Sequence, residues 1–177
     1  EYADLFYSHF RSLSDLSKEE NSFAPALCNR IDRNTGGIVI AAKNAEALRE
    51  MNAKIREDEL RKIYLCAVHG KLEKKQDTLT TYLKENKNNV VYVTNDPTGQ
   101  RAVTHYEVVK ESGEYSLLKV RIDTGRKNQI RVQLKAEGHA IIGDDKYGCT
   151  KNPLKRLGLH ASKLEFIHPI HKEIVSI

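Results

Sequence analysis

The stretch THYEVVKESGEYSLLKVRI, residues 104–122, limits which fold class the chain can adopt. Two runs rich in β-branched, aromatic and leucine side chains, residues 104–109 and 115–122, flank a polar segment that contains Glu-Ser-Gly-Glu. Such a pair of runs around a glycine predicts a β-hairpin. A second pair, residues 79–83 and 90–93, flanks a Lys/Asn turn and predicts another hairpin. Hairpin connections favour an α+β domain with a mixed, mostly antiparallel sheet.

Further elements are predicted on both sides of these hairpins. Apolar residues at helical spacing predict a helix at residues 2–13, and Asn44 is suited to cap a helix that begins at Ala45. Asn128 is likewise suited to cap a short helix that stops at Gly138. That helix is predicted at residues 129–137, and strands are predicted at residues 38–42, 62–70 and 157–166.

Composition limits the functional classes. With 177 residues, 40% of them hydrophobic, the chain can form one domain with its own core. It has 29 Lys and Arg against 24 Asp and Glu, and the net charge of +5 suits a polyanionic partner such as nucleic acid, although many other proteins share it. Neither a signal peptide nor an apolar run of transmembrane length is evident, so we expect a soluble, cytoplasmic protein.

Cysteine and histidine usage points away from disulfides and metals. The chain contains three cysteines, Cys28, Cys66 and Cys149. They form no C-x-x-C pair and lie beside apolar or small residues, so we expect buried free thiols in a reducing compartment. The histidines His160, His168 and His171 match no zinc-site spacing, and we expect them to be structural or to contact RNA.

The segment NRIDRNTGG, residues 29–37, places one carboxylate between two arginines and directly before a glycine turn. Because Arg30 and Arg33 flank Asp32, we expect them to lower the pKa of its carboxyl and to keep it ionised at neutral pH. An exposed ion pair or a turn-capping aspartate explains this pattern. A nucleophile or base set against a polyanion, with the arginines holding phosphates, explains it too, and the segment alone does not distinguish these readings.

The segment DTGRKNQIRVQL, residues 123–134, supplies a second cluster of cations. Arg126 and Lys127 directly precede the predicted helix, where backbone N–H groups and the helix dipole favour a phosphate. A solvated basic face is the competing interpretation. Arg131 lies between two apolar residues, so we expect it to be partly buried and to need an anionic partner, for which Asp32 is a candidate.

Two further segments have both a structural and a functional interpretation. Tyr64 lies in the strand predicted at residues 62–70, where a tyrosine is more often a core residue than a catalytic one. Its ring can nevertheless stack on a base, and its hydroxyl can relay a proton. The paired acids of GDDKYG, residues 143–148, are expected to form a turn at the end of a strand.

Five segments, taken together and in order, resemble the motifs of the RluA-type RNA pseudouridine synthases of the ribosomal large subunit type. The resemblance runs from about residue 27 to residue 170. Asn29 stands where this family usually has histidine, and Lys127 and Asn128 stand where it has Thr-His. The five segments are NRIDRNTGG (29–37), KIYLCAVHG (62–70), GRKNQIRVQ (125–133), GHAIIGDDKYG (138–148) and LHA followed by FIHP (159–161 and 166–169).

This resemblance implies an enzyme that isomerises uridine to pseudouridine in RNA, and a pseudouridine synthase catalytic fold whose sheet is flanked by helices. It implies a single catalytic domain over residues 1–177, without the N-terminal strand and the S4-like domain that the family often has. Ribosomal RNA is the favoured partner, with transfer RNA as the other candidate, and the implied state is a monomer with no membrane partner. Because the isomerisation adds and removes nothing, no cofactor and no metal is expected.

The resemblance also implies residue roles. Asp32 would act beside C1′, either by attacking it or by drawing a proton from C2′, and both routes stay open. Arg131 would pair with Asp32, while Tyr64 would stack on the uracil, with its hydroxyl a candidate for removing the C5 proton. The target base would be flipped out, and Arg30 would occupy the vacated space. The implied RNA-binding residues are Arg30, Arg33, Thr35, Arg126, Lys127, Asn128 and Gln129.

Two other functions are compatible with the sequence. The first is an RNA-binding or assembly module that has this fold but does not turn over substrate. The second is a hydrolase in which Asp32 and a second acid, such as Asp123 or Asp144, cleave a glycosidic bond. Only Asp32 lies in a strong motif, so the hydrolase ranks below the other two.

Overall fold

The computed structural model describes residues 23–148 and 152–177, which form mainly β-strands and, within these ranges, two helices. The helices are α2 (Ala45–Arg56) and α3 (Gln129–Ala136). The strands are β1 (Ala26–Leu27), β2 (Gly36–Gly37), β3 (Ala41–Ala42), β4 (Arg61–His69), β5 (Gln76–Glu85), β6 (Val91–Thr94), β7 (Gln100–Ser112), β8 (Tyr115–Ile122), β9 (Leu159–Ile167) and β10 (Ile174–Ser176).

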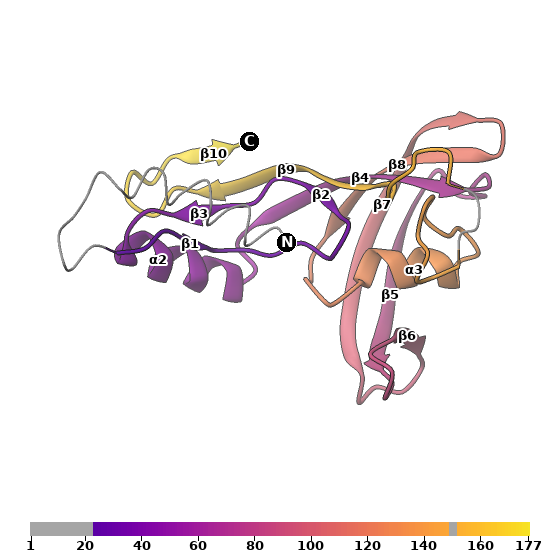
Figure 1. The fold of residues 1–177 in the computed structure, drawn as a ribbon, viewed down its shortest axis with the longest axis horizontal. Coiled ribbons are helices and arrows are strands. Elements are labelled where there is room, and N and C mark those ends of the chain that lie inside the picture. Colours follow the sequence, from indigo (N-terminus) through magenta and orange to yellow (C-terminus); the bar gives the residue numbers. More distant parts are fainter. Residues whose placement is uncertain (1–22, 149–151) are drawn as a thin grey trace.

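One long sheet runs through the molecule (Figure 1). Within the described ranges it has eight strands in the order β10-β9-β4-β8-β7-β5-β6, with β2 pairing beside β9. The pairing of β2 with β9 is parallel, and the pairs along the rest of the sheet are antiparallel. β1 and β3 form a separate two-stranded pair. The prediction of a mixed, mostly antiparallel sheet is therefore confirmed.

The hairpin predicted within residues 104–122 forms the centre of this sheet. β7 and β8 pair antiparallel from Thr104 opposite Ile122 to Ser112 opposite Tyr115. Along β8 the side chains alternate, so that Val120 is fully buried while the preceding Lys119 is exposed. A period of two places one set of side chains in the core and the other in water.

Helix α3 covers the buried face of the sheet and forms the main core with it (Figure 1). Ile130 and Leu134, four residues apart on α3, pack in one cluster with Cys66 of β4 and Leu118 of β8. Cys66 is a fully buried free thiol, as predicted, and burial raises its pKa. Cys28 is a partly buried free thiol, and Cys149 lies outside the described residues.

Helix α2 lies at the opposite end of the sheet from α3 (Figure 1). The predicted N-cap is confirmed, because Asn44 Oδ1 accepts a hydrogen bond of 2.8 Å from the Ala47 N–H. Met51 packs with Leu60 and Phe166 in a second small core. Within the described residues, no helix has the length and apolar character needed to cross a membrane.

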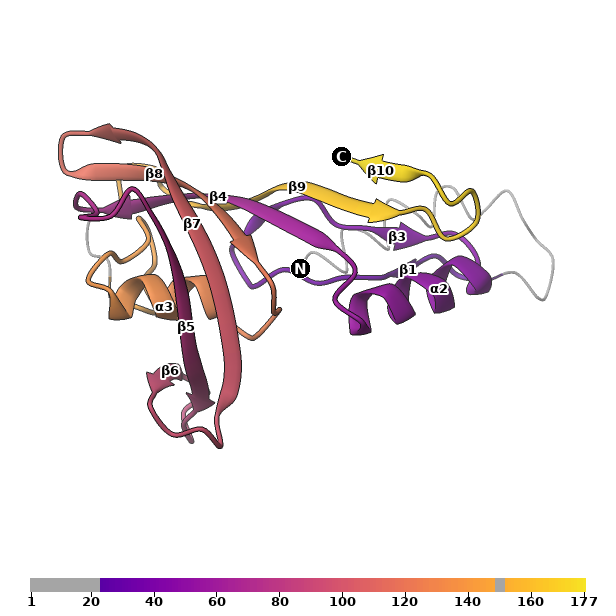
Figure 2. The ribbon, with the colours of Figure 1, turned by 180° about the vertical axis from the view of Figure 1, so that it is seen from behind.

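Strands β5 and β7 extend from the sheet as an arm, with β6 at its far end (Figures 1 and 2). β5 and β6 form the hairpin predicted at residues 79–83 and 90–93. Leu83 and Val91 of this arm pack with Val132 of α3 and with Tyr147. The arm is therefore fixed to the domain by the helix that also lines the candidate site.

Some predicted elements differ from the structure. Residues 38–42 do not form one buried strand. Ala41 and Ala42 form β3, which pairs with β1, whereas the Ile38 N–H donates to the Ala161 carbonyl of β9 and Val39 is 40% exposed. The strands predicted at residues 62–70 and 157–166 are confirmed as β4 and β9, whereas β10 was not predicted. The helix predicted at residues 2–13 lies outside the described residues.

Gly37 explains why a glycine turn follows the Asp32 segment. Its φ is 118°, and a Cβ atom there would lie 2.2 Å from the carbonyl oxygen of Ala161 on β9. Only glycine tolerates both the positive φ and this close approach. The parallel contact with β9 brings the Asp32 turn close to β4, which pairs with β9 on its other edge.

Candidate active site

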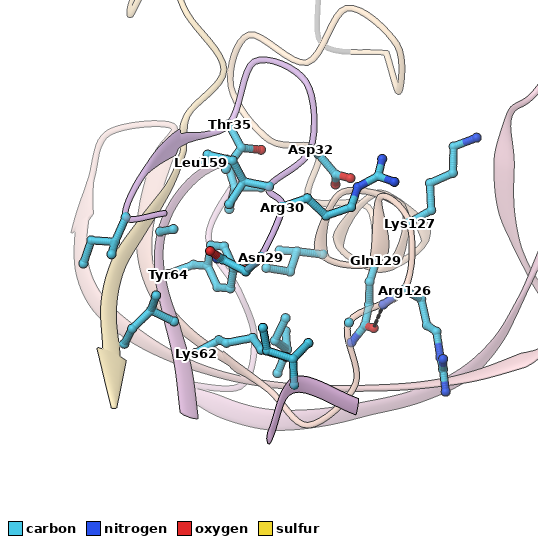
Figure 3. A pocket seen from close by; sticks show the side chains of 18 of the residues that line it. Asn29, Arg30, Asp32, Thr35, Lys62, Tyr64, Arg126, Lys127, Gln129 and Leu159 are labelled. Atoms are coloured by element: carbon cyan, nitrogen blue, oxygen red, sulfur yellow. Dashed lines mark hydrogen bonds between the residues drawn. The ribbon is translucent and has the colours of Figure 1, made fainter. Parts of the chain in front are cut away.

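A cavity of about 630 Å³ lies where the Asp32 segment meets β4, β9 and the loop before α3 (Figure 3). It brings together side chains that are distant in the sequence. Arg33, Asn128 and Arg131 are not among the residues that line it. The predicted site residues that do line it are Arg30, Asp32, Thr35, Tyr64, Arg126, Lys127 and Gln129.

Asp32 occupies the first position of a tight turn at the wall of this cavity. The Thr35 N–H donates to the Asp32 carbonyl oxygen at 3.0 Å, and Asn34 in the turn has a φ of 71°, which asparagine tolerates better than most residues. The Asp32 carboxylate accepts a long hydrogen bond of 3.4 Å from the Asn128 N–H. Its position is thus only loosely fixed by the protein.

The predicted lowering of the Asp32 pKa is wrong. Burial raises the pKa of this carboxyl above its ordinary value, and the Asn128 N–H and the charges of Arg131, Arg30 and Lys146 only partly oppose that effect. Sequence proximity overstated the role of the flanking arginines, because both side chains are exposed to solvent, which screens their charges. A raised pKa makes Asp32 a stronger base or nucleophile once it is ionised.

Arg131 is buried, as predicted, but its partner is Asp144 and not Asp32. Its Nε and Nη2 atoms donate to the two Asp144 carboxylate oxygens at 2.8 and 2.7 Å, and Asp144 is 1% exposed. The remaining nitrogen, Nη1, donates to Asn128 Oδ1 at 2.9 Å. The guanidinium also lies 5.1 Å from the centre of the Tyr147 ring. Arg131 therefore influences Asp32 through its charge, without a direct ion pair.

Asn128 connects this buried pair to Asp32. The prediction that its side chain caps α3 is wrong. Asn128 has a left-handed conformation with a φ of 54° and forms no side-chain cap. Its side chain instead accepts from Arg131 and donates to the Tyr147 hydroxyl at 3.0 Å. These bonds fix the residue so that its backbone N–H points at the Asp32 carboxylate.

Two glutamines fix α3 to the sheet. Gln129 donates from Nε2 to the Val103 carbonyl and to Thr104 Oγ1, and its Oε1 accepts from the Arg126 N–H at 3.1 Å. Gln133, one turn later, accepts from the Thr104 hydroxyl at 2.6 Å. Asn128 and Gln129 are both buried, and these bonds give their side chains partners inside the protein. Their predicted contact with RNA stays a prediction.

Tyr64 and Lys62 line the cavity from β4, on alternate positions of the strand (Figure 3). Burial and the nearby Asp32 charge raise the pKa of Tyr64 to about 12, so its hydroxyl is protonated at neutral pH. The Lys62 ammonium lies close to Gly125, since a Cβ atom built there would be 3.7 Å from Nζ. Sequence reasoning missed Lys62, although the period of two around Tyr64 indicates it.

The cations of the predicted RNA-binding set are exposed. Arg126 donates from Nε to the Arg101 carbonyl at 3.2 Å, and Lys127 forms an ion pair with Glu85 of β5. Arg30 and Arg33 extend from the Asp32 segment into solvent. An exposed ion pair is worth little, so Lys127 can exchange Glu85 for a phosphate at small cost.

Three other polar residues considered from the sequence, Asp123, His168 and Asp144, have partners within the protein. Asp123, a candidate second carboxyl for a hydrolase, pairs with His105 and Arg121 on the exposed face of the sheet. His168 Nδ1 accepts from two backbone N–H groups of its own turn, which is a structural role. Asp144 was predicted as a turn residue, but it is the partner of Arg131, and the available signal was its place in the motif GDDKYG.

The sequence profile of the RNA pseudouridylate synthase family matches residues 5–136. The chain belongs to this family. It is 32% identical to an uncharacterised RNA pseudouridine synthase of Bacillus subtilis over 147 residues, which are 83% of this chain and 52% of that protein. It is 34% identical to the ribosomal large subunit pseudouridine synthase C of Vibrio vulnificus over 158 residues, 85% of this chain and 50% of that protein.

A third pseudouridine synthase is similar in sequence, and two solved structures share the fold. The ribosomal large subunit pseudouridine synthase D of Borreliella burgdorferi is 32% identical over 160 residues, 89% of this chain and 49% of that protein. The chain thus spans about half the length of the curated relatives it matches. Human RNA pseudouridylate synthase domain containing 1 has the same fold, with a TM-score of 0.77, 23% identity and coverage of 87% of this chain and 68% of that chain. Human RNA pseudouridylate synthase domain containing 4 also has this fold, with a TM-score of 0.75, 19% identity and coverage of 92% of this chain and 73% of that chain.

Proposed function

We propose that this chain isomerises uridine to pseudouridine in RNA, with Asp32 as the essential carboxylate. One observation carries the proposal: in a chain of the pseudouridylate synthase family, Asp32 and Tyr64 line the same cavity, and cationic side chains line its wall. A cavity of about 630 Å³ has the size of an ordinary small-molecule site and accommodates a nucleotide.

In this reaction the N1–C1′ bond of the target breaks, the uracil turns, and a C5–C1′ bond forms. The C5 proton leaves and N1 gains a proton, so the composition of the RNA does not change. Asp32 takes part either by bonding to C1′ or by accepting a proton from C2′. Both routes need an ionised carboxylate with little competing hydrogen bonding, and the single long bond from Asn128 supports that requirement.

Tyr64 supplies a ring for the uracil and a hydroxyl that stays protonated. Because its pKa is raised to about 12, the phenolate is scarce at neutral pH. Tyr64 therefore relays the C5 proton through its hydroxyl and does not act as a preformed anionic base. Its ring faces the base by stacking, as aromatic side chains do in other nucleic-acid sites.

Arg131 acts at one remove from the substrate. Its ion pair with Asp144 fixes Asn128, and the Asn128 N–H then points at the Asp32 carboxylate. The charge of Arg131 also favours the ionised form of Asp32. We therefore assign Arg131 and Asp144 to positioning Asp32 and not to contact with RNA.

The RNA strand enters over the exposed cations of the cavity wall. Arg126 and Lys127 precede α3, and Arg30 and Lys62 lie on the other walls of the cavity. These groups bind phosphates, and Arg30 occupies the space of the flipped base. Ribosomal RNA is the favoured substrate, because the names of two of the relatives specify the ribosomal large subunit.

Tritium release from RNA labelled at uridine C5 tests this function. The wild-type chain is expected to release tritium from an unmodified ribosomal RNA transcript, while Asp32→Asn releases none and still binds the RNA. Asp123→Asn is the matched control, because Asp123 is an aspartate on the exposed face of the sheet. Loss of RNA binding in a folded Asp32→Asn protein would contradict the assigned role.

The two alternatives predict different results in the same assay. A non-catalytic RNA-binding module binds the transcript but releases no tritium with either protein. A hydrolase liberates free uracil, which chromatography of the products detects. Against the hydrolase, Asp123 is engaged on the outer face of the sheet and Asp144 is held by Arg131, so neither is available as a second carboxyl beside Asp32.

A further inference from the structure

Among the described residues, one buried side-chain polar atom has no hydrogen-bond partner, and it is Oγ1 of Thr35. Thr35 is 1% exposed, yet it lines the same cavity as Asp32. A buried hydroxyl without a partner costs free energy, and native proteins rarely keep one without a reason. The position of this hydroxyl in the candidate active site points to a function there.

The Asp32 carboxylate, in turn, has fewer hydrogen-bond donors around it than it can accept from. An ionised carboxylate can accept about four hydrogen bonds, and the one that it receives from the described residues is the long bond from Asn128. Asp32 and Thr35 are the first and last residues of one tight turn, closed by the bond between their backbones. Figure 3 shows the Thr35 oxygen on the side of its residue that is turned toward Asp32.

We propose that Thr35 is a positioning residue whose hydroxyl donates to the Asp32 carboxylate when a nucleotide fills the cavity. This inference rests on the proposed function and adds one residue to it. Both side chains belong to one turn, and rotation about their torsions reorients the threonine hydroxyl and the carboxylate without unfolding that turn. The Thr35 hydroxyl, which has no partner in the free protein, is thus available to bond to Asp32 when RNA is bound.

A hydrogen bond from the Thr35 hydroxyl is expected to change the pKa of the Asp32 carboxyl, which can be measured. The carboxylate is faced by Arg30 from its own segment, by Arg131 from α3, by Lys146 from the segment after α3, and by the neutral hydroxyl of Tyr64 from β4. Burial outweighs these cations and raises the pKa. An added hydrogen bond favours the ionised form, so its removal raises the pKa further. The acid limb of the kcat profile then moves to higher pH.

Thr35→Val tests the proposal, because valine has nearly the same shape and no hydroxyl. The expected result is a kcat about tenfold lower, the usual effect of one hydrogen bond to a charged group, with KM for the RNA transcript unchanged. The acid limb of kcat moves to higher pH, whereas the melting temperature stays the same or rises because an unpartnered polar group has been removed. Thr35→Ser keeps the hydroxyl and is expected to restore the wild-type pH profile.

Thr78→Val is the matched control, since the Thr78 hydroxyl bonds to His105 on the exposed face of the sheet. It is expected to leave kcat and its pH profile unchanged. A Thr35→Val protein with wild-type kcat and pH profile overturns the role of Thr35 while the proposed function stands. Equal losses in Thr35→Val and Thr35→Ser overturn it in favour of a packing role. Absence of turnover by the wild type, with RNA bound, overturns the proposed function and this role together.

Discussion

Asp32 and Arg131, which the sequence indicated as partners, are held by the protein in opposite ways. Arg131 forms three short hydrogen bonds to buried side chains, one to Asn128 just before α3 and two to Asp144 after it. Asp32 lies on a loop between two-residue strands and has one long hydrogen bond. The buried Arg131 thus has its charge and hydrogen bonds satisfied within the protein, whereas the Asp32 carboxylate and the Thr35 hydroxyl have few partners or none among the described residues.

Breaking the buried ion pair of Arg131 and Asp144 is expected to have the largest effect on stability. Asp144→Ala leaves the buried Arg131 guanidinium without its carboxylate, which costs about 3–5 kcal/mol of unfolding free energy. Urea denaturation monitored by circular dichroism measures this loss. Asp123→Ala is the control, because its ion pairs are exposed and its cost is within about 1 kcal/mol. Equal losses in the two variants would contradict the contrast between buried and exposed pairs.

A substitution at Gly37 tests how the Asp32 segment is held against β9. Gly37→Ala places a methyl group 2.2 Å from the Ala161 carbonyl oxygen, and the expected loss is about 2–3 kcal/mol together with a large loss of turnover. Gly138→Ala is the control, because Gly138 also has a positive φ but no atom within 4 Å of a built Cβ. If both variants lose the same stability, backbone strain and not the contact with β9 is the cause.

Asp32→Asn is expected to change the free energy of unfolding little, and to raise it where the previous two substitutions lower it. Since burial raises the folded-state pKa of Asp32, its ionised form is disfavoured in the folded protein, and the variant should be at least as stable as the wild type at neutral pH, within about 1 kcal/mol. The difference should shrink as the pH falls through the folded pKa and should vanish below the unfolded value of about 3.9, where the carboxyl is protonated in both states. Urea titrations at neutral and acidic pH measure it, and a variant clearly less stable at neutral pH would show that the carboxylate is structural.

The smallest expected effect concerns the entrance to the site. Glu85→Gln releases Lys127 from an exposed ion pair worth about 0.2–1 kcal/mol, so RNA affinity should rise a few-fold. The slope of log affinity against log salt should become steeper by about one. Glu165→Gln is the control, because Glu165 also pairs with a lysine but does not line the cavity, and it should leave the salt slope unchanged. An unchanged slope in Glu85→Gln would place Lys127 outside the RNA path.

Local patterns in the sequence predicted the sheet well because hairpins and capped helices depend on near neighbours. The β7–β8 hairpin and the Asn44 cap of α2 formed as expected. The prediction failed at residues 38–42, where the Ile38 N–H bonds to β9 while Ala41 and Ala42 pair with β1. Apolar composition indicates burial but does not identify the neighbouring strand, and that choice depends on contacts with segments outside the run, such as β1 and the distant β9.

The candidate site divides in the same manner. The motifs identified Asp32 and Tyr64, and both line the cavity. They did not identify Asp144 as the partner of Arg131, nor the left-handed Asn128 that connects this pair to Asp32. Pairing of buried charges is decided by side-chain geometry after the chain has folded, and a sequence lists only the candidates.

The sequence by itself determined the family, the antiparallel sheet and which aspartate lies before the glycine turn, because periodicity, turn residues and motif order are local properties of the chain. Only the tertiary structure decided the direction of the Asp32 pKa and the partner of Arg131. It also left the Thr35 hydroxyl unpartnered. The physical reason is that desolvation and hydrogen-bond satisfaction depend on what the folded chain places around a group, and segments distant in sequence supply most of those neighbours.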